Sequence, residues 1–530
     1  MVPGHPIVRF RLYPRPVCIT MRGGRDSVRD QTVMLRPLLA TIAFSIWLTI
    51  GVRPAIADPG EAQAAPCTHD TCYTQAEAQE DLFVLFRELR ENHFDLYARR
   101  SAGDYARHYE ELLEEVDGPI PRARFHLMLH RMLAYGNVGH AKTEAALLDG
   151  LAHLQHGGRV IPLSIRYHGD DMILEEWADD SEALPPGATI TSLGGLKLRE
   201  FETRARALIS ADTDRLLRAQ LEQGLPIYLY LLFGDIEYLE IGFVRPDGLR
   251  GTHRVPARSY QELTALAEER PVKRPEFDGS SRAFHPLDDD VFYLRPGPFS
   301  ATLQERGEEG AAYAVDGFRA FIDDAFAALA ESEAGNLVID LRGNEGGDAS
   351  FSDLLIARIA DRPFTFASRY AVRAGEHTKI AWSRYDGPPD TLTGRVARGI
   401  ADAEAGATFE VDLPLVPPAR KDRFEGRVWV LVNRHSYSNA AVVAALVQDY
   451  GFGTLMGEST ADLATTYGAV ESFTLPNSEA VVYYPKAYMV RPSGDETVAG
   501  VRPDVPLPPQ PVGTSEDRVL AAALAHIRSK

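Results

Sequence analysis

The chain has 530 residues, an apolar content of 45% and a charged content of 25%, which are ordinary values for a folded soluble protein. Its formal net charge is −19, and residues 1–57 hold eight Arg and two Asp, which leaves −25 on the remainder. Such an acidic protein is a poor partner for nucleic acid or for an anionic membrane. The length is too great for one ordinary hydrophobic core and predicts two or three domains.

The N-terminal segment, residues 1–57, is predicted to be a secretory signal. Arginines precede an apolar run from Leu38 to Val52, and Ala55-Ile56-Ala57 forms a small-residue cleavage site. We therefore expect an exported protein, periplasmic or secreted, that is cleaved near Ala57. The run is short for a membrane span, although an uncleaved N-terminal anchor is an alternative. Met21 and Met34 are alternative translation starts to the first Met.

Two cysteines, Cys67 and Cys72, remain after the predicted signal. Because an exported chain meets oxidising conditions, we expect them to form one small disulfide. A zinc site that includes His69 is the weaker interpretation, since no second ligand pair follows downstream. The chain also lacks a His-Glu-x-x-His motif, and no metal or cofactor is predicted.

Residues 58–150 are predicted to form a helical module. Apolar residues recur at helical spacing after Thr74, and further helices are expected at Tyr105–Val116 and Arg122–Leu133. Two glycines break the pattern just before His140, so this histidine is expected on a turn that follows a helix. By itself, a histidine in such a position is more typical of a protein surface.

Residues 158–258 change character toward β-structure. Paired strands are predicted at Arg159–Tyr167 and Asp171–Trp177, then a Pro-Gly turn, a helix at Arg199–Ile209 and a strand-rich end at Leu229–Val244. This order resembles a PDZ domain, which implies a module that takes an extended peptide on an open strand edge. A plain β-rich spacer is the alternative.

The second half alternates strands and helices after a polar segment, residues 259–289, that is predicted to be a linker. A strand begins at Val291, a helix covers Asp316–Ala330, and an apolar strand from Asn336 ends in a charged glycine turn. Another helix begins near Phe351. This alternation predicts an α/β arrangement with ligands at the carboxyl ends of the strands. Residues 362–423, by contrast, are predicted to be an irregular insertion.

A strand, a turn and a helix then follow in close succession. The strand Val428–Val432 is apolar without alternation, as in a strand that is covered on both faces. The turn Asn433–Ser438 leads into an apolar helix, Asn439–Asp449. A hydroxyl at this point faces the positive end of the helix dipole, which suits a nucleophile whose reaction develops an oxyanion. The alternative is that Ser438 only caps the helix.

Three stretches together resemble the S41 serine peptidases, the family of the C-terminal processing proteases and the tricorn core protease. They are Ile339–Gly347, then Ser436–Asn439 with its downstream Gly457–Thr460, and last Gly500–Asp504. The resemblance implies an α/β catalytic domain, ClpP-crotonase-like, over residues 280–512. The family commonly adds a PDZ domain and a helical N-terminal module, in agreement with the patterns above. Residues 513–530 are expected to form a C-terminal helix.

The resemblance also implies the catalytic residues. It puts the nucleophile at Ser438, which the processing proteases pair with a lysine shortly after Gly-Glu-x-Thr. No lysine stands there in this chain, and a serine hydroxyl needs a base at neutral pH. Tricorn-like members use a histidine from an upstream Gly-His segment, here Gly139-His140, supported by a late glutamate, here Glu496. Asp495 is the alternative to Glu496.

The oxyanion is expected to meet backbone N–H groups of the Gly346-Gly347 turn and of Asn439. Glycine suits this turn because the backbone must approach the substrate closely. Lys142 and Lys486 are the alternative bases of a Ser-Lys dyad.

The predicted activity is hydrolysis of peptide bonds in protein or peptide substrates through an acyl-enzyme. A non-catalytic peptide- or lipid-binding protein on the same scaffold is the alternative from another class. An α/β-hydrolase esterase is disfavoured because the chain has no Gly-x-Ser-x-Gly elbow. Cleavage preference and oligomeric state stay open.

Overall fold

The structure is a computed structural model. It describes residues 67–68, 71–177, 183–269, 274–275, 277–302, 305, 314–385 and 387–530. The predicted signal, residues 1–57, and His69 lie outside the described residues. A disulfide joins Cys67 to Cys72. None of the described helices combines the length and apolar character that crossing a membrane requires.

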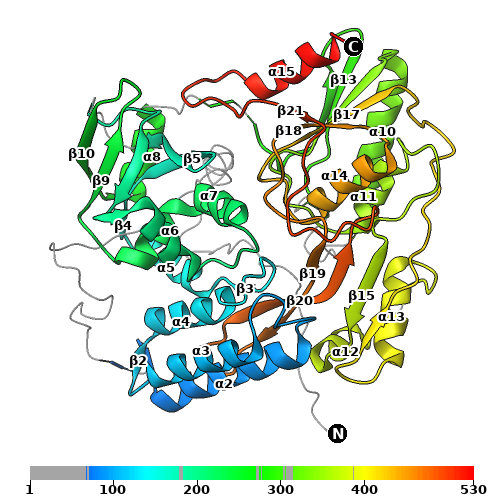
Figure 1. The fold of residues 1–530 in the computed structure, drawn as a ribbon. Helices are drawn as coiled ribbons and strands as arrows, with labels where there is room; N and C mark the ends of the chain where they lie inside the picture. Colours follow the sequence, from blue (N-terminus) through cyan, green and yellow to red (C-terminus); the bar gives the residue numbers. More distant parts are fainter. Residues whose placement is uncertain are drawn as a thin grey trace, which may run out of the picture. The chain divides into compact units, whose positions relative to one another are not determined.

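The first part of the described chain is mainly helical (Figure 1). Its elements are β1 (Cys72–Tyr73), α2 (Gln75–Asn92), α3 (Ala102–Glu114), β2 (Ile120–Pro121), α4 (Arg122–Ala134), β3 (Lys142–Thr143) and α5 (Ala145–Gln155). Thr74 starts α2 with a capping box, in which its side chain accepts the Glu77 N–H and the Glu77 side chain reaches back. Because α4 ends at Ala134, the segment that carries His140 is a turn between α4 and β3.

The next part is built around a six-stranded sheet with the strand order β10-β9-β7-β6-β5 and with β8 paired to β7. The elements are β4 (Arg159–Val160), β5 (Leu163–His168), β6 (Asp171–Trp177), β7 (Thr189–Leu193), β8 (Leu196–Lys197), α6 (Leu198–Arg206), α7 (Asp214–Phe233), β9 (Tyr238–Val244), β10 (Arg250–Pro256), β11 (Arg258–Ser259) and α8 (Tyr260–Glu269).

Two boundaries of the sequence prediction are wrong in this region. The expected strand-rich end at residues 229–244 begins with the last turn of α7, whose Leu229 and Leu231 are buried, and only β9 is a strand. The expected linker at 259–289 contains the helix α8 and the strand β12 (Ala283–Pro286). In both places, packing against the neighbouring sheet or helix overrode the local composition.

A six-stranded sheet of the C-terminal half has the strand order β12-β13-β14-β17-β18-β21, in which β12 is antiparallel and the other neighbours are parallel. The other strands are β13 (Val291–Arg295), β14 (Asn336–Asp340), β17 (Arg427–Val432), β18 (Thr454–Gly457) and β21 (Val505–Pro506). Four helices belong to it: α10 (Asp316–Ser332), α11 (Ala349–Ile356), α14 (Asn439–Tyr450) and α15 (Arg518–Ile527). Because β14 and β17 are parallel neighbours, the turns after them meet at one edge of the sheet.

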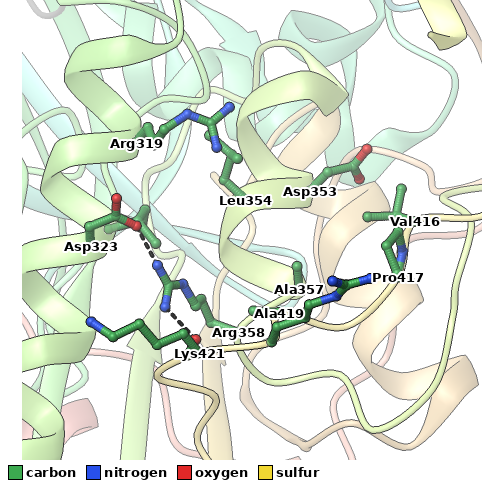
Figure 2. A pocket seen from close by; sticks show the side chains of 12 residues that line it. Arg319, Asp323, Asp353, Leu354, Ala357, Arg358, Val416, Pro417, Ala419 and Lys421 are labelled. Atoms are coloured by element: carbon green, nitrogen blue, oxygen red, sulfur yellow. Dashed lines mark hydrogen bonds and ion pairs between the residues drawn. The ribbon is translucent and has the colours of Figure 1, made fainter. Parts of the chain in front are cut away.

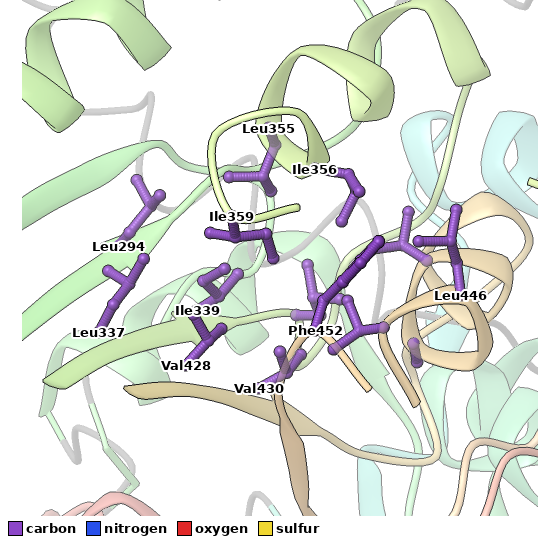
Figure 3. Packing of buried hydrophobic residues seen from close by; sticks show 14 of the residues in the cluster. Leu294, Leu337, Ile339, Leu355, Ile356, Ile359, Val428, Val430, Leu446 and Phe452 are labelled. Carbon is purple, nitrogen blue, oxygen red and sulfur yellow. The ribbon is translucent and has the colours of Figure 1, made fainter. Parts of the chain in front are cut away.

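The two faces of this sheet bury different helices. Alternate residues of β14 and β17, such as Ile339 and Val430, pack with α10, α11 and α14 (Figure 3). The intervening residues, such as Val338 and Leu431, pack against α15. Since a strand places successive side chains on opposite faces, cover on both faces requires the unbroken apolar runs seen in the sequence.

A second sheet of the C-terminal half has the strand order β16-β15-β20-β19. It contains β15 (Arg369–Arg373), β16 (Thr408–Glu410), β19 (Thr466–Thr474) and β20 (Val481–Val490), with the helices α12 (Glu376–Trp382) and α13 (Leu392–Asp402) between β15 and β16. The expected irregular insertion at 362–423 is therefore ordered around two helices and two strands, which corrects the prediction. The short β3 pairs with β20 and so joins the segment of His140 to the C-terminal half.

Candidate active site

Ser438 lies at the sharp turn between β17 and α14. Its backbone has φ 52° and ψ −124°, and its side chain makes no capping hydrogen bond. A non-glycine residue at positive φ is strained, and such strain collects at functional positions. The structure therefore does not support the interpretation of Ser438 as a simple helix cap.

The turn between α4 and β3 brings His140 next to this serine. His140 Nε2 lies 3.4 Å from Ser438 Oγ, although the two residues are 298 positions apart in the chain. The ring of Tyr437 stacks on the imidazole with 5.2 Å between the ring centroids. The preceding residue, Gly139, donates its N–H to Asp212 Oδ2 at 2.8 Å, which fixes the backbone before the histidine.

The environment of His140 keeps its imidazole neutral. Burial lowers its pKa to about 4, because the charged form loses its hydration, and Lys142 lowers it further. The carboxylate of Asp212 acts in the opposite direction. A neutral imidazole is the form that can accept a proton from a hydroxyl. Within the described residues, the Nδ1 atom of this ring is buried and has no hydrogen-bond partner.

The structure does not bring Glu496 to His140. The exposed Glu496 carboxylate accepts a hydrogen bond from the Tyr488 hydroxyl at 2.9 Å. Asp495 is also exposed, and its carboxylate accepts from the N–H and hydroxyl of Thr497. The expected contact of either acid with Nδ1 is therefore absent from this structure, because each carboxylate is held by a neighbour on its own segment.

Of the three backbone N–H groups predicted to bind the oxyanion, one already donates a hydrogen bond within the protein and two do not. The Gly346 N–H donates to Asn344 Oδ1 at 2.8 Å, which corrects the expectation that it faces an oxyanion. In the described part of the chain, no hydrogen bond engages the N–H of Gly347 or of Asn439. Asn439 Nδ2 donates to Ser352 Oγ at 3.0 Å, which ties the start of α14 to α11. These two N–H groups remain as candidates.

Gly346 contributes through the close approach of its backbone. A Cβ atom at this position would lie 2.7 Å from Asn439 N and 2.8 Å from Ser438 Cβ, and its φ is 86°. Both the contact and the positive φ exclude other residues without a shift of the turn. The glycine turn after β14 therefore packs directly on the backbone of Ser438.

Two buried carboxylates near His140 were not singled out from the sequence. Asp462 Oδ2 accepts the Ser438 N–H at 2.6 Å and lies 3.9 Å from His140 Nε2. Burial raises the pKa of Asp462 to about 6, against hydrogen bonds from the backbone of Leu463 and Ser438. Asp212 is buried as well, and Arg99 lies 3.6 Å from its Oδ1. The missing lysine drew attention to the segment of Asp462, whereas nothing in the sequence indicates Asp212.

The two alternative bases are placed differently. Lys486 Nζ is buried 2.7 Å from Glu471 Oε1, and the ring of Trp382 lies 4.9 Å from the ammonium. Lys142 is exposed at the start of β3. Neither lysine makes a hydrogen bond to Ser438 within the described residues. His140 is thus the basic side chain in contact with the serine hydroxyl.

A cavity of about 440 Å³ lies elsewhere, between α10, α11 and residues 416–421 (Figure 2). Arg358 of its wall pairs with Asp323, and the half-buried Asp353 has a pKa raised to about 7 by desolvation and by Asp348. Neither Ser438 nor any other candidate catalytic residue lines it. Among the described residues, no three His, Cys, Asp or Glu side chains are grouped so as to hold a metal ion.

Comparison with known proteins gives a family match for part of the chain. Residues 312–507 match the family model described as Peptidase family S41. A search of curated proteins found no match. A crystal structure of a CPAF S499A mutant is similar at 14% identity with a TM-score of 0.56, over 82% of this chain and 93% of that one. Mature CPAF complexed with lactacystin is similar at 15% identity with a TM-score of 0.55, over 86% and 97%. At these identities the likeness establishes the fold.

Proposed function

We propose that the chain is an exported serine endopeptidase with a Ser438–His140 catalytic pair, since its residues 312–507 match the model of peptidase family S41. The observation that carries this proposal is the 3.4 Å separation of His140 Nε2 and Ser438 Oγ. Catalytic hydrogen bonds are commonly long in a site without substrate and shorten when substrate binds.

The chemistry follows from this geometry. His140 Nε2 takes the hydroxyl proton as Ser438 Oγ attacks the peptide carbonyl carbon. The tetrahedral intermediate collapses, the leaving amine takes the proton from His140, and the acyl group stays on the serine. A water molecule then releases the acid by the same steps in the second half of the reaction. The neutral imidazole, with its pKa lowered to about 4 by burial, is ready to accept a proton at neutral pH.

The oxyanion of this intermediate is assigned to the N–H groups of Gly347 and Asn439. Both lie on segments that pack against Ser438, and Asn439 is the first residue of α14, where the helix dipole favours negative charge. The free N–H groups in the described part of the chain support this assignment.

A Ser-Lys dyad is the second mechanism to consider. The ion pair of Lys486 with Glu471 holds its ammonium as a structural cation. A lysine that serves as the base must reach the serine hydroxyl, whereas the hydrogen bonds of Lys486 Nζ in the described part of the chain go to Glu471 and to the Ala469 carbonyl. These contacts support His140 over Lys486.

Substrates are proposed to be proteins or peptides, as the family implies. An exported location is proposed from the predicted signal and agrees with the pairing of Cys67 with Cys72. Sequencing the N-terminus of the protein recovered outside the cytoplasm should find a start shortly after Ala57. A mature N-terminus that retains residues 1–57 would contradict the cleavage.

The catalytic role is tested with Ser438→Ala. We expect hydrolysis of fluorescently labelled casein to fall on the order of 10⁴-fold or more, because serine peptidases lose nearly all turnover without the nucleophile. Ser493→Ala, at an exposed serine, is the matched control and should retain wild-type activity. The unfolding temperature of both variants should match that of the wild type.

A serine-directed fluorophosphonate probe separates the peptidase from a non-catalytic binding protein. It should label wild-type protein at Ser438 and should label His140→Gln much more slowly. Casein hydrolysis at the wild-type rate by Ser438→Ala, or equal labelling of the wild type and His140→Gln, contradicts the proposed pair.

A further inference from the structure

The carboxylate closest to the reacting atoms is that of Asp462. Its Oδ2 atom lies 3.9 Å from His140 Nε2, the nitrogen that receives the proton, and 2.6 Å from the backbone nitrogen of Ser438. One carboxylate oxygen thus contacts both members of the catalytic pair. The exposed Glu496, which the sequence suggested for this role, is instead bonded to Tyr488.

Asp462 is held rigidly by the segments around it. Thr460 Oγ1 donates to the Asp462 carbonyl at 2.7 Å, and the Val501 N–H donates to Thr460 Oγ1 at 2.9 Å. Gly500 permits this contact, because a Cβ atom there would lie 1.8 Å from the Thr460 carbonyl oxygen. The stretches Gly457–Thr460 and Gly500–Asp504, which carry the resemblance to the S41 peptidases, therefore fix the position of Asp462 beside the serine.

The second oxygen of the Asp462 carboxylate, Oδ1, lacks a partner among the described residues before the reaction begins. The Asp462 side chain is fully buried. A buried, incompletely solvated carboxylate is costly, and a neighbouring cation would relieve that cost. The imidazolium that His140 becomes during the reaction is such a cation, and it forms only when Ser438 attacks.

We propose that Asp462 is a positioning residue of the peptidase, which holds Ser438 in its strained turn and stabilises the protonated His140 from the Nε2 side. The inference rests on the proposed Ser438–His140 function. As the serine oxygen bonds to the carbonyl carbon, its proton moves to Nε2, and the positive charge appears 3.9 Å from the Asp462 carboxylate. The proton then passes to the leaving amine, and Asp462 stays ionised throughout.

Other charged groups surround the pair and bear on its titration. Asp212 faces His140 from the segment between α6 and α7, and burial, together with the charge of Asp462, raises the pKa of Asp212. Arg99 lies beside Asp212 and partly offsets its charge. Lys142 faces the imidazole from β3 and disfavours its protonation. Asp462 is the member of this group that touches the serine backbone.

The pKa values of the pair make the proposal testable through pH. Burial raises the pKa of Asp462 to about 6, whereas burial lowers that of His140 to about 4. Between these values His140 is still a neutral base, but Asp462 has lost the charge that stabilises the imidazolium. Activity should therefore fall as the pH drops through about 6, rather than through about 4.

The experiment measures kcat and KM for a fluorogenic peptide, and the rate of fluorophosphonate labelling, between pH 4 and 8. We expect the pH profile of the wild-type kcat to fall on its acid side with a midpoint near pH 6, which we call the acid limb. In Asp462→Asn, kcat should fall roughly 10- to 100-fold with little change in KM, and the limb should move toward 4, because the amide does not titrate. Glu496→Gln should leave the limb near 6.

Several results would overturn the role of Asp462. A wild-type limb near 4 in both assays excludes it, and this measurement needs no variant to fold. A limb that stays near 6 in Asp462→Asn but disappears in Glu496→Gln makes Glu496 the partner instead. Failure of the Ser438–His140 pair itself is distinguishable, because Ser438 would then not be labelled at any pH.

Discussion

Gly346 shows how one residue determines the geometry of the nucleophile. Its Cα packs on the turn of Ser438, and a Cβ atom would lie 2.6 Å from the Tyr437 carbonyl oxygen. That oxygen is backbone and cannot rotate away, so the turn must move as a whole. The same residue donates its N–H to Asn344, so its contribution is steric rather than electrostatic.

At this scale we predict that Gly346→Ala lowers kcat/KM for a peptide substrate by roughly 10²-fold, because a displacement of reacting groups by about 1 Å costs that much. Gly118→Ala is the matched control, since nothing lies within 4 Å of a Cβ there and its φ is not positive. Steady-state kinetics and fluorophosphonate labelling measure the effect. Wild-type kcat/KM in Gly346→Ala would contradict the steric role.

At the scale of elements, α14 connects the nucleophile to the largest apolar core of the catalytic part. Its first residue follows Ser438 directly, and Leu446 belongs to the same buried cluster as Ile356 of α11 and Val430 of β17 (Figure 3). A helix that is apolar almost all round can be stable only when it is enclosed on most sides. The position of Ser438 thus depends on packing that lies about two helical turns away from it.

We predict that Leu446→Ala destabilises the protein by about 2–5 kcal/mol, the cost of the lost apolar contacts plus the cavity that remains. Leu415→Ala is the control, since that side chain is 66% exposed and should change stability by less than about 0.5 kcal/mol. Urea unfolding followed by circular dichroism measures both. Equal midpoints for the two variants would show that α14 is not packed as described.

At the scale of the whole molecule, a buried ion cluster connects the six-stranded sheet region to the turn of the nucleophile. Glu222 of α7 contacts Arg434 at 2.7 Å and His435 at 2.8 Å, and Arg434 also contacts Glu458 at 2.8 Å. Both Arg434 and His435 belong to the turn that precedes Ser438. Glu222 also accepts a hydrogen bond from the backbone N–H of Tyr167 on the edge strand β5, and Arg434 donates one to the Tyr167 carbonyl.

We predict that Glu222→Gln destabilises the protein by about 1–3 kcal/mol and lowers kcat, because Arg434 and His435 lose a charged partner and Arg434 keeps Glu458 alone. Burial opposes ionisation of Glu222, but its hydrogen bond with His435 and the charge of Arg434 hold its pKa below the ordinary value of 4.5. A lowered pKa contributes stability above pH 4.5 that is lost as the pH falls below it. The variant should lose less stability than the wild type over that acid range.

Glu110→Gln is the control for this cluster, because Glu110 is exposed on α3. Thermal unfolding between pH 3 and 7, with casein hydrolysis at pH 7, measures both effects. If Glu222→Gln unfolds and turns over like Glu110→Gln, the cluster does not support the nucleophile turn.

Local sequence patterns predicted the strands and helices near the nucleophile, and the resemblance to the S41 peptidases suggested the candidate pair. Unbroken apolar runs predicted the strands β14 and β17, because cover on both faces leaves that pattern in any chain. The strand, turn and helix around Ser438 were equally local. His140 was inferred from the tricorn-like resemblance of its Gly-His segment and from the missing lysine. Where regular structure depends on packing, as in residues 362–423, composition alone predicted an irregular insertion and was wrong.

The surroundings of the pair arise from contacts between segments that are distant in the chain. The pairing of β3 with β20 joins segments that are about 340 residues apart, and no local pattern encodes that contact. Asp212 and Asp462 reach the site for the same reason, and their chemistry arises from burial, which raises the pKa of each carboxyl. Hydrogen bonds formed in the fold likewise engage the Gly346 N–H and hold Glu496 at Tyr488. A sequence records which groups are present, whereas desolvation and competing partners, which exist only in the folded chain, decide how each group acts.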